Sequence, residues 1–185
     1  MVGLGNPGAD YVDTRHNAGF WLVEQIAAEQ SISFRPEKRF HAEICKFSSH
    51  GRDCYLMKPQ TFMNHSGRAV AALARYYKLK PAQILMIHDE LDLPPGVSRL
   101  KSGGGHGGHN GLRDAIAQLG SRDFFRVRLG IGHPGDAKKV INYVLRKPSI
   151  SDRHAIDQAI QDTLAVVPLV LEGSVEKAMH VLHTR

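Results

Sequence analysis

The stretch Ile84-Leu85-Met86-Ile87-His88-Asp89-Glu90 decides the fold class of this chain. Four apolar residues in a row are typical of a strand that is buried on both faces of a mainly parallel sheet. The run ends in polar residues, and we expect Asp89 just beyond the carboxyl end of the strand, where open α/β sheets place their ligands. The stretch therefore predicts a sheet covered by helices and a functional site at one edge of it.

Strand-like and helix-like segments alternate on both sides of this stretch. The spacing of apolar residues predicts helices at about 17–30, 66–78, 110–119 and 137–145, a longer one capped by Ser151, and a last one at about 174–183. Ser66 is the expected N-cap of the second helix. Further strands are expected at 1–4, 41–48, 53–58, 97–101 and 125–131. In the last of these, apolar and basic residues alternate, so Arg126 and Arg128 should share a solvated face. The pattern predicts an α/β fold: a single domain over residues 1–185 with a mixed, mostly parallel central β-sheet flanked by helices.

Composition excludes several classes of protein. With 185 residues, 42% of them hydrophobic and 23% charged, the chain can bury one substantial core without disulfides. No apolar run reaches membrane-spanning length, and Met1 leads straight into a glycine loop without a secretory signal, so we expect a cytoplasmic protein with no membrane contact. A net charge of +6 favours a polyanionic partner. Because the basic residues form no long run, a folded surface that contacts phosphates is expected rather than a basic tail.

Residues Gly3-Leu4-Gly5-Asn6-Pro7-Gly8 match the Gly-x-Gly-x-x-Gly pattern of a dinucleotide-binding loop. In that fingerprint the loop opens directly into a helix whose N-terminal amides hold the pyrophosphate. Here helical spacing starts only near Asn17, after a polar loop that carries Arg15 and His16. This delay argues against a dinucleotide oxidoreductase, which is kept as the weakest alternative.

Four loop clusters are rich in polar side chains: residues 6–17, 61–64, 88–90 and 103–111. Strand ends at one edge of an α/β sheet would bring such loops together. His16 is the best candidate for a general base, because imidazoles ordinarily titrate near neutral pH, and Asp89 could orient it. No serine or cysteine lies in a nucleophile-elbow setting, so water is the expected attacker, with asparagine amides as donors to an oxyanion: Asn6, Asn64 and Asn110.

Each of these assignments has a plainer structural alternative. His16 could be a loop histidine bonded to backbone, Asp89 a turn or cap residue, and Asn110, which precedes Gly111, an ordinary turn residue. His106 and His109 have a spacing found among zinc ligands, but a glycine-filled loop orders ligands poorly and offers no third one, so no metal is expected. Glycines 103–108 would instead let the backbone approach a phosphate or sugar. Four basic side chains could surround that phosphate: Lys101, Arg113, Arg126 and Arg128.

The four clusters together resemble the bacterial-type peptidyl-tRNA hydrolase family. The matching stretches cover nearly the whole chain in order and spacing: residues 3–8, Tyr11, residues 14–19, 61–67, 88–94, 103–112 and 130–134. One departure is that family members usually carry a few apolar residues before the glycine loop, so a shortened first strand is expected here.

The resemblance implies an esterase that cleaves the bond between a peptide and the 3′-terminal ribose of tRNA, recycling tRNA from aborted translation. By this likeness His16 accepts the proton of water and Asp89 keeps it basic. Asn6 would contact the peptide main chain and separate peptidyl-tRNA from aminoacyl-tRNA with a free amine. Family members act as monomers without metal or cofactor.

The resemblance also implies how peptidyl-tRNA, the expected partner, is held. Four residues match positions that bind the tRNA end: Tyr11, Phe62, Asn64 and Asn110. Lys101 and Arg128 match a basic clamp for the acceptor-stem phosphate. The helix after Ser151 is expected to flank the peptide. The alternatives are a non-catalytic RNA-binding relative and a metal-dependent hydrolase that uses His106 and His109.

Overall fold

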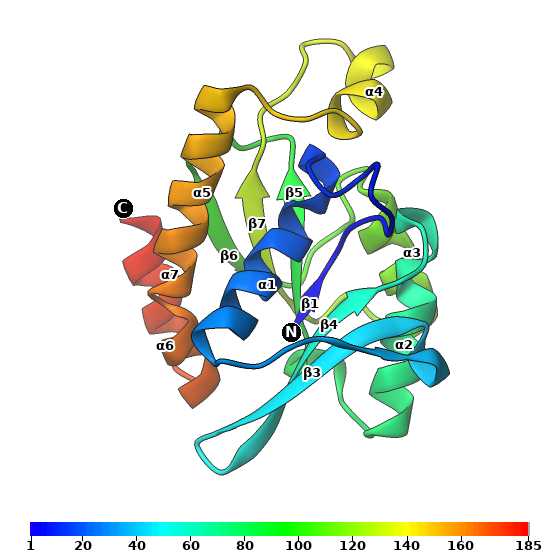
Figure 1. Ribbon diagram of the computed structural model, residues 1–185. Helices are drawn as coiled ribbons and strands as arrows, with labels where there is room; N and C mark the ends of the chain where they lie inside the picture. Colours follow the sequence, from blue (N-terminus) through cyan, green and yellow to red (C-terminus); the bar gives the residue numbers. More distant parts are fainter. Residues whose placement is uncertain (185) are drawn as a thin grey trace.

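One seven-stranded sheet with helices on both faces makes up the computed structural model, which describes residues 1–184 (Figure 1). The strand order is β2-β3-β4-β1-β5-β7-β6. The four central strands are parallel, whereas β2, β3 and β6 pair antiparallel. The expected α/β fold with a mixed sheet is confirmed. The strands are β1 Val2–Gly3, β2 Arg35–Glu37, β3 Ala42–Ser49, β4 Arg52–Pro59, β5 Leu85–Glu90, β6 Ser98–Ser102 and β7 Phe125–Gly130.

Seven α-helices lie within residues 1–184, and all but α4 pack around the two faces of the sheet (Figure 1). They are α1 Ala18–Glu29, α2 Ser66–Tyr76, α3 Asn110–Leu119, α4 Val140–Val144, α5 Ile150–Leu164, α6 Val167–Glu172 and α7 Val175–His183. One apolar cluster joins α1, α5 and α7 to β5 and β7, and a second joins α2 and α3 to the other face. No helix among these combines the length and the apolarity that a membrane span requires.

The short strand β1 places the first loop of the site. It lies between β4 and β5, with Val2 opposite Met57 and Met86. A Cβ on Gly19 of α1 would lie 2.4 Å from the carbonyl oxygen of Ile87, and one on Gly3 would lie 2.3 Å from the carbonyl oxygen of Gly19. Only glycine lets α1 pack this closely on β1 and β5. The close packing fixes the loop between β1 and α1, which carries Asn6 and His16.

Several details differ from the expectations. The first strand is Val2–Gly3 rather than residues 1–4. Ser66 is the first residue of α2 and His65 its N-cap, so that prediction is wrong by one residue. The cap of α5 is Ser149, whose Oγ accepts from the Asp152 amide, and not Ser151. Asp89 lies within β5 rather than beyond its end.

Strand β7 does not have the solvated basic face that its alternation suggests. Arg126 is only 3% exposed, and its guanidinium donates to the carbonyl oxygens of Gly104 and Gly105. Arg128 is half-buried and paired with Glu90. The expectation fails because the glycine-rich loop folds back over this part of the sheet and covers Arg126.

Candidate active site

A pocket of about 280 Å³ lies at the carboxyl ends of β1 and β5. All four polar clusters contribute to it, which confirms that the fold brings them together. The predicted residues that line it are Asn6, His16, Phe62, Asn64, Asp89 and Asn110. A larger cavity, of about 400 Å³, lies at the opposite end of the parallel strands beside Met1, Tyr55 and Leu85, and none of the four clusters reaches it.

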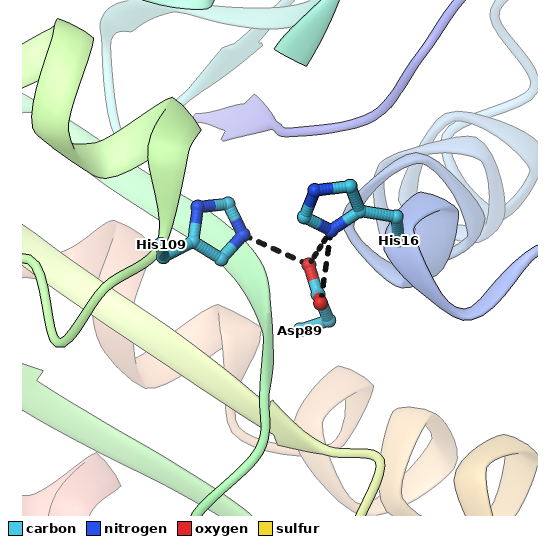
Figure 2. A group of neighbouring side chains, drawn as sticks. All are labelled: His16, Asp89 and His109. Atoms are coloured by element: carbon cyan, nitrogen blue, oxygen red, sulfur yellow. Dashed lines mark hydrogen bonds and ion pairs between the residues drawn. The ribbon is translucent and has the colours of Figure 1, made fainter. Parts of the chain in front are cut away.

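Asp89 is the centre of a three-residue cluster in this pocket (Figure 2). Its two carboxylate oxygens lie 2.9 and 3.0 Å from Nδ1 of His16. Oδ1 also lies 2.8 Å from Nε2 of His109, so both rings face one carboxylate. His16 comes from the 3-10 helix Arg15–Asn17 and His109 from the N-cap of α3. Three separate elements therefore meet at Asp89.

The hydrogen bonds assign the tautomers of both histidines. An ionised carboxylate only accepts, so Nδ1 of His16 and Nε2 of His109 each carry a hydrogen. His109 Nδ1 in turn accepts from the Leu112 amide at 3.3 Å. In a neutral His16 ring this arrangement leaves the lone pair on Nε2. That is the tautomer that a general base needs.

The charge of Asp89 is stabilised by its two partners. Burial alone would raise the pKa of its carboxyl, but the positive charges that His16 and His109 carry when protonated, together with the hydrogen bonds from both rings, hold that pKa well below its usual range. For His88, on the same strand, the neutral form is favoured instead of the charged form. Burial, reinforced by nearby His109, lowers the pKa of His88 to about 3. Asp89 is therefore ionised and His88 neutral at physiological pH.

Asn6 is held rigidly at the base of the pocket. Its side-chain oxygen accepts from the Met63 amide at 2.7 Å, and its backbone exchanges two hydrogen bonds with the Asn17 side chain. These contacts fix the orientation of the amide, because the oxygen already has its donor. Nδ2 of Asn6 has no hydrogen-bond partner within residues 1–184, and Asn6 is one of the residues that line the pocket.

The residues expected to bind the tRNA end lie around the rim. Asn64 and Asn110 are exposed at the pocket mouth. Tyr11 does not line the pocket, but its ring meets that of Phe62 edge-on with centroids 6.1 Å apart. Lys101 and Arg128 lie outside the pocket on the neighbouring strands β6 and β7. The ammonium of Lys101 is exposed near Gly104, in the glycine-rich loop.

The histidine pair considered as a metal site is not assembled. His106 Nδ1 accepts from the Gly108 amide, whereas His109 turns toward Asp89. The only described side chains with metal-ligand atoms gathered in this way are His16, Asp89 and His109, all within 4.8 Å of one another. Both imidazole nitrogens in that group already donate to the carboxylate, so an ion would have to displace two hydrogen bonds.

The sequence patterns do not predict two parts of the pocket. From the sequence His109 is a candidate only as a zinc ligand, although its place beside Asn110 at the start of a predicted helix is a signal for a site residue. One wall is apolar and comes from α4 and its C-cap: Val140, Ile141, Val144 and Leu145. The helix after Ser151, expected to flank the peptide, does not line the pocket.

Comparison with known proteins identifies the family. The model of the peptidyl-tRNA hydrolase family matches residues 1–185. The peptidyl-tRNA hydrolase of Methylobacillus flagellatus is 56% identical over 185 residues, all of this chain and 96% of the relative, and that of Neisseria meningitidis is 52% identical with the same coverage. The crystal structure of the Acinetobacter baumannii peptidyl-tRNA hydrolase superposes with a TM-score of 0.95 at 46% identity, covering 98% of this chain and 92% of that one. The chain therefore belongs to the peptidyl-tRNA hydrolase family.

Proposed function

We propose that this pocket hydrolyses the ester of peptidyl-tRNA with a water molecule activated by His16. Family membership supports the reaction, because the relatives are named for it. One observation carries the mechanism: Asp89 lies 2.9 Å from Nδ1 of His16, so a neutral ring keeps its lone pair on Nε2, in a residue that lines the pocket. The same set of residues argues against a non-catalytic RNA-binding relative, which would not need a base.

The reaction proceeds in two proton transfers. Nε2 of His16 takes a proton from water while the water oxygen attacks the ester carbonyl, and the ionised Asp89 stabilises the imidazolium that forms. Neutral amide donors at the pocket, with Asn64 and Asn110 as candidates, stabilise the oxyanion. The intermediate then expels the ribose oxygen, which takes the proton back from His16. An ester has a good leaving group, so one base and amide donors suffice.

Asn6 distinguishes peptidyl-tRNA from aminoacyl-tRNA in this proposal. Its Nδ2 group donates to the carbonyl that acylates the α-amine of the last residue, and a free aminoacyl-tRNA lacks that carbonyl. The fixed orientation of the amide supports this role, because the oxygen is engaged by the Met63 amide. Because this hydrogen bond from Asn6 involves only the main chain of the peptide, it can form with peptides of any sequence.

The tRNA is held by contacts that carry no base information. Phe62, which is 57% exposed, and Tyr11 flank the 3′ adenosine, and Asn64 and Asn110 bind its polar groups. Lys101 and Arg128 clamp an acceptor-stem phosphate. We place this reaction in the cytoplasm and assign it to a monomer of one domain, without metal or cofactor.

The decisive experiment compares an N-acetylaminoacyl-tRNA with the same tRNA carrying the free amino acid. The wild type should cleave only the first, and His16→Ala should lose ester cleavage by several orders of magnitude while still binding tRNA. His50→Ala, in the exposed turn between β3 and β4, is the matched control and should retain full activity. Undiminished turnover by His16→Ala would remove His16 from its role, and loss of activity in chelator would favour a metal-dependent mechanism.

A further inference from the structure

Arg15, the neighbour of His16, is a buried cation whose side chain points away from the reaction site. It is 7% exposed. Its Nη1 donates to three carbonyl oxygens near the end of α4, those of Tyr143, Arg146 and Lys147, at 3.3, 3.3 and 2.9 Å. The Arg15 amide also donates to Arg146 O at 3.1 Å. Arg15 by itself therefore binds the backbone of α4 and of the segment that follows it.

These contacts place the positive charge of Arg15 at the C-terminal end of α4, as in a helix cap. The carbonyl end of a helix carries a partial negative charge and attracts cations. The guanidinium also lies 4.0 Å from the centroid of the Tyr143 ring. Its one carboxylate neighbour, Asp152, lies 3.4 Å away and is partly exposed. The charge of Arg15 is therefore compensated mainly by the C-terminal end of α4 and by Tyr143.

Helix α4 has few other connections to the body of the molecule. It stands apart from the other helices beyond the ends of β5 and β7 (Figure 1). Tyr143 Oη donates to Ile131 O at 2.6 Å, and Val144 enters the core. A surface bridge between Lys147 and Asp13 joins the same two segments as Arg15, but both side chains are largely exposed. Of the two less exposed polar tethers, Arg15 and Tyr143 Oη, Arg15 makes the larger number of hydrogen bonds.

The face that α4 turns to the pocket is apolar and unusually open. Ile141 is 70% exposed and Leu145 39%, yet both line the pocket that holds His16 and Asp89. Apolar surface left open to water in a pocket is the part of a site that an apolar ligand group covers. Of the groups beside the ester, the side chain of the amino acid that forms it is the one that can be apolar, so it is the occupant that suits this wall.

We propose that Arg15 is a positioning residue that holds α4 as the wall for the side chain of the last amino acid of the peptide. The inference rests on the proposed function. The wall supplies a preference for large apolar side chains at that position, and Arg15 maintains the preference without touching substrate. Because Asn6 binds the main chain of any peptide, every peptide remains a substrate. The wall changes only how tightly different last residues bind.

The test uses one tRNA body charged with either N-acetylleucine or N-acetylglycine. The wild type should favour the leucyl ester through a lower KM. Arg15→Gln should raise KM for the leucyl ester about tenfold, the range expected of one hydrophobic pocket. It should leave KM for the glycyl ester and kcat for both within about twofold. Ile141→Ser should reproduce this change, and the double variant should add nothing, because Arg15 acts through the wall.

Asp13→Asn is the matched control, since it breaks the exposed bridge between the same segments and should keep the leucyl preference. Arg15→Lys keeps the charge with fewer donors and should fall between wild type and Arg15→Gln, which also tests the idea if Arg15→Gln does not fold. An unchanged leucyl-to-glycyl ratio in both Arg15 variants would overturn the proposal, as would equal loss of kcat on both esters. A wild type that cleaves neither ester would refute the proposed function, and this inference with it.

Discussion

Asp89 accepts from two imidazoles at once, and this explains why the position requires a carboxylate. An asparagine has one acceptor oxygen and an NH₂ group, so it would place a donor against one of the two N–H groups. Burying a charge is costly unless it is paired and hydrogen-bonded, and Asp89, 3% exposed, satisfies that condition only through His16 and His109. His16 and Asp89, the proposed base and its orienting group, therefore also form a structural unit with His109.

His88 makes folding sensitive to mild acid. Its pKa is about 3 in the folded protein, whereas an unfolded histidine has a pKa of about 6.5. Between these values the unfolded chain binds more protons, so the free energy of unfolding falls as pH falls, by about 1.4 kcal/mol per pH unit for this group. Acidifying from about pH 6.5 to 4.5 should cost roughly 2 to 3 kcal/mol. Asp89 acts in the same direction, but only as pH approaches the ordinary carboxyl pKa and falls below it.

Urea unfolding at both pH values would measure this effect in the wild type and in His88→Gln. The variant should lose most of the pH dependence in this window, whatever its stability at neutral pH. His50→Gln, exposed in the β3–β4 turn, should retain the wild-type slope. An equally steep slope in His88→Gln would show that other groups cause the acid sensitivity.

At the scale of elements, the sequence predicts what depends on local pattern. The apolar run 84–87 and the polar loops after each strand sufficed to place the fold class and most of the pocket. Local pattern does not fix the ends of helices, because Ser149 and Ser151 both precede the same apolar spacing and only the hydrogen bond to Asp152 selects Ser149. Strand β2 contains Pro36 and forms only because it pairs with β3. The wall formed by α4 depends on contacts of Arg15 with residues far along the chain, which no local pattern encodes.

A substitution at Gly19 in α1 would show how closely the packing of this helix and catalysis are linked. A Cβ at Gly19 would meet the backbone of Leu4 and Ile87 at 2.5 and 2.4 Å, and backbone cannot move aside as a flexible side chain can. Gly19→Ala should therefore lower the free energy of unfolding by about 1 to 3 kcal/mol or more. Because α1 follows directly on the 3-10 helix that carries His16, kcat should fall as well. Gly105→Ala, where a Cβ meets nothing within 4 Å, is the stability control. A Gly19→Ala variant as stable as wild type would mean that α1 can shift freely on the sheet.

Over the whole molecule, cations concentrate on β6 and β7. Lys101 lies opposite Arg126, and Arg99 opposite Arg128, in the antiparallel register. Like charges in facing positions destabilise a sheet. Hydrogen bonds to loop carbonyls compensate the charge of Arg126, and an ion pair with Glu90 compensates that of Arg128. Within the described chain no carboxylate pairs with Lys101. The arrangement is costly in the free protein, and a bound phosphate would offset that cost.

Removing these charges should act on binding more than on chemistry. Lys101→Ala and Arg128→Ala should each raise KM for peptidyl-tRNA about tenfold or more at low salt, with a smaller change in kcat, because a hydrogen bond to a charged group typically contributes about 1.5 to 3 kcal/mol. Each lost phosphate contact should also make the slope of log KM against log salt shallower by about 0.7 to 0.9. Arg128→Ala additionally leaves Glu90 unpaired at the pocket, so its KM should rise further than that of Lys101→Ala.

The control for this experiment is Lys46→Ala, which removes the same charge from β3, distant from the clamp and paired with Asp53. It should leave both KM and the salt slope unchanged, which separates a local phosphate contact from a general effect of net charge. If Lys46→Ala weakens binding as much as Lys101→Ala, Lys101 and Arg128 have no special role in binding. If Lys101→Ala lowers kcat with an unchanged KM, Lys101 acts on the transition state and the clamp is wrong.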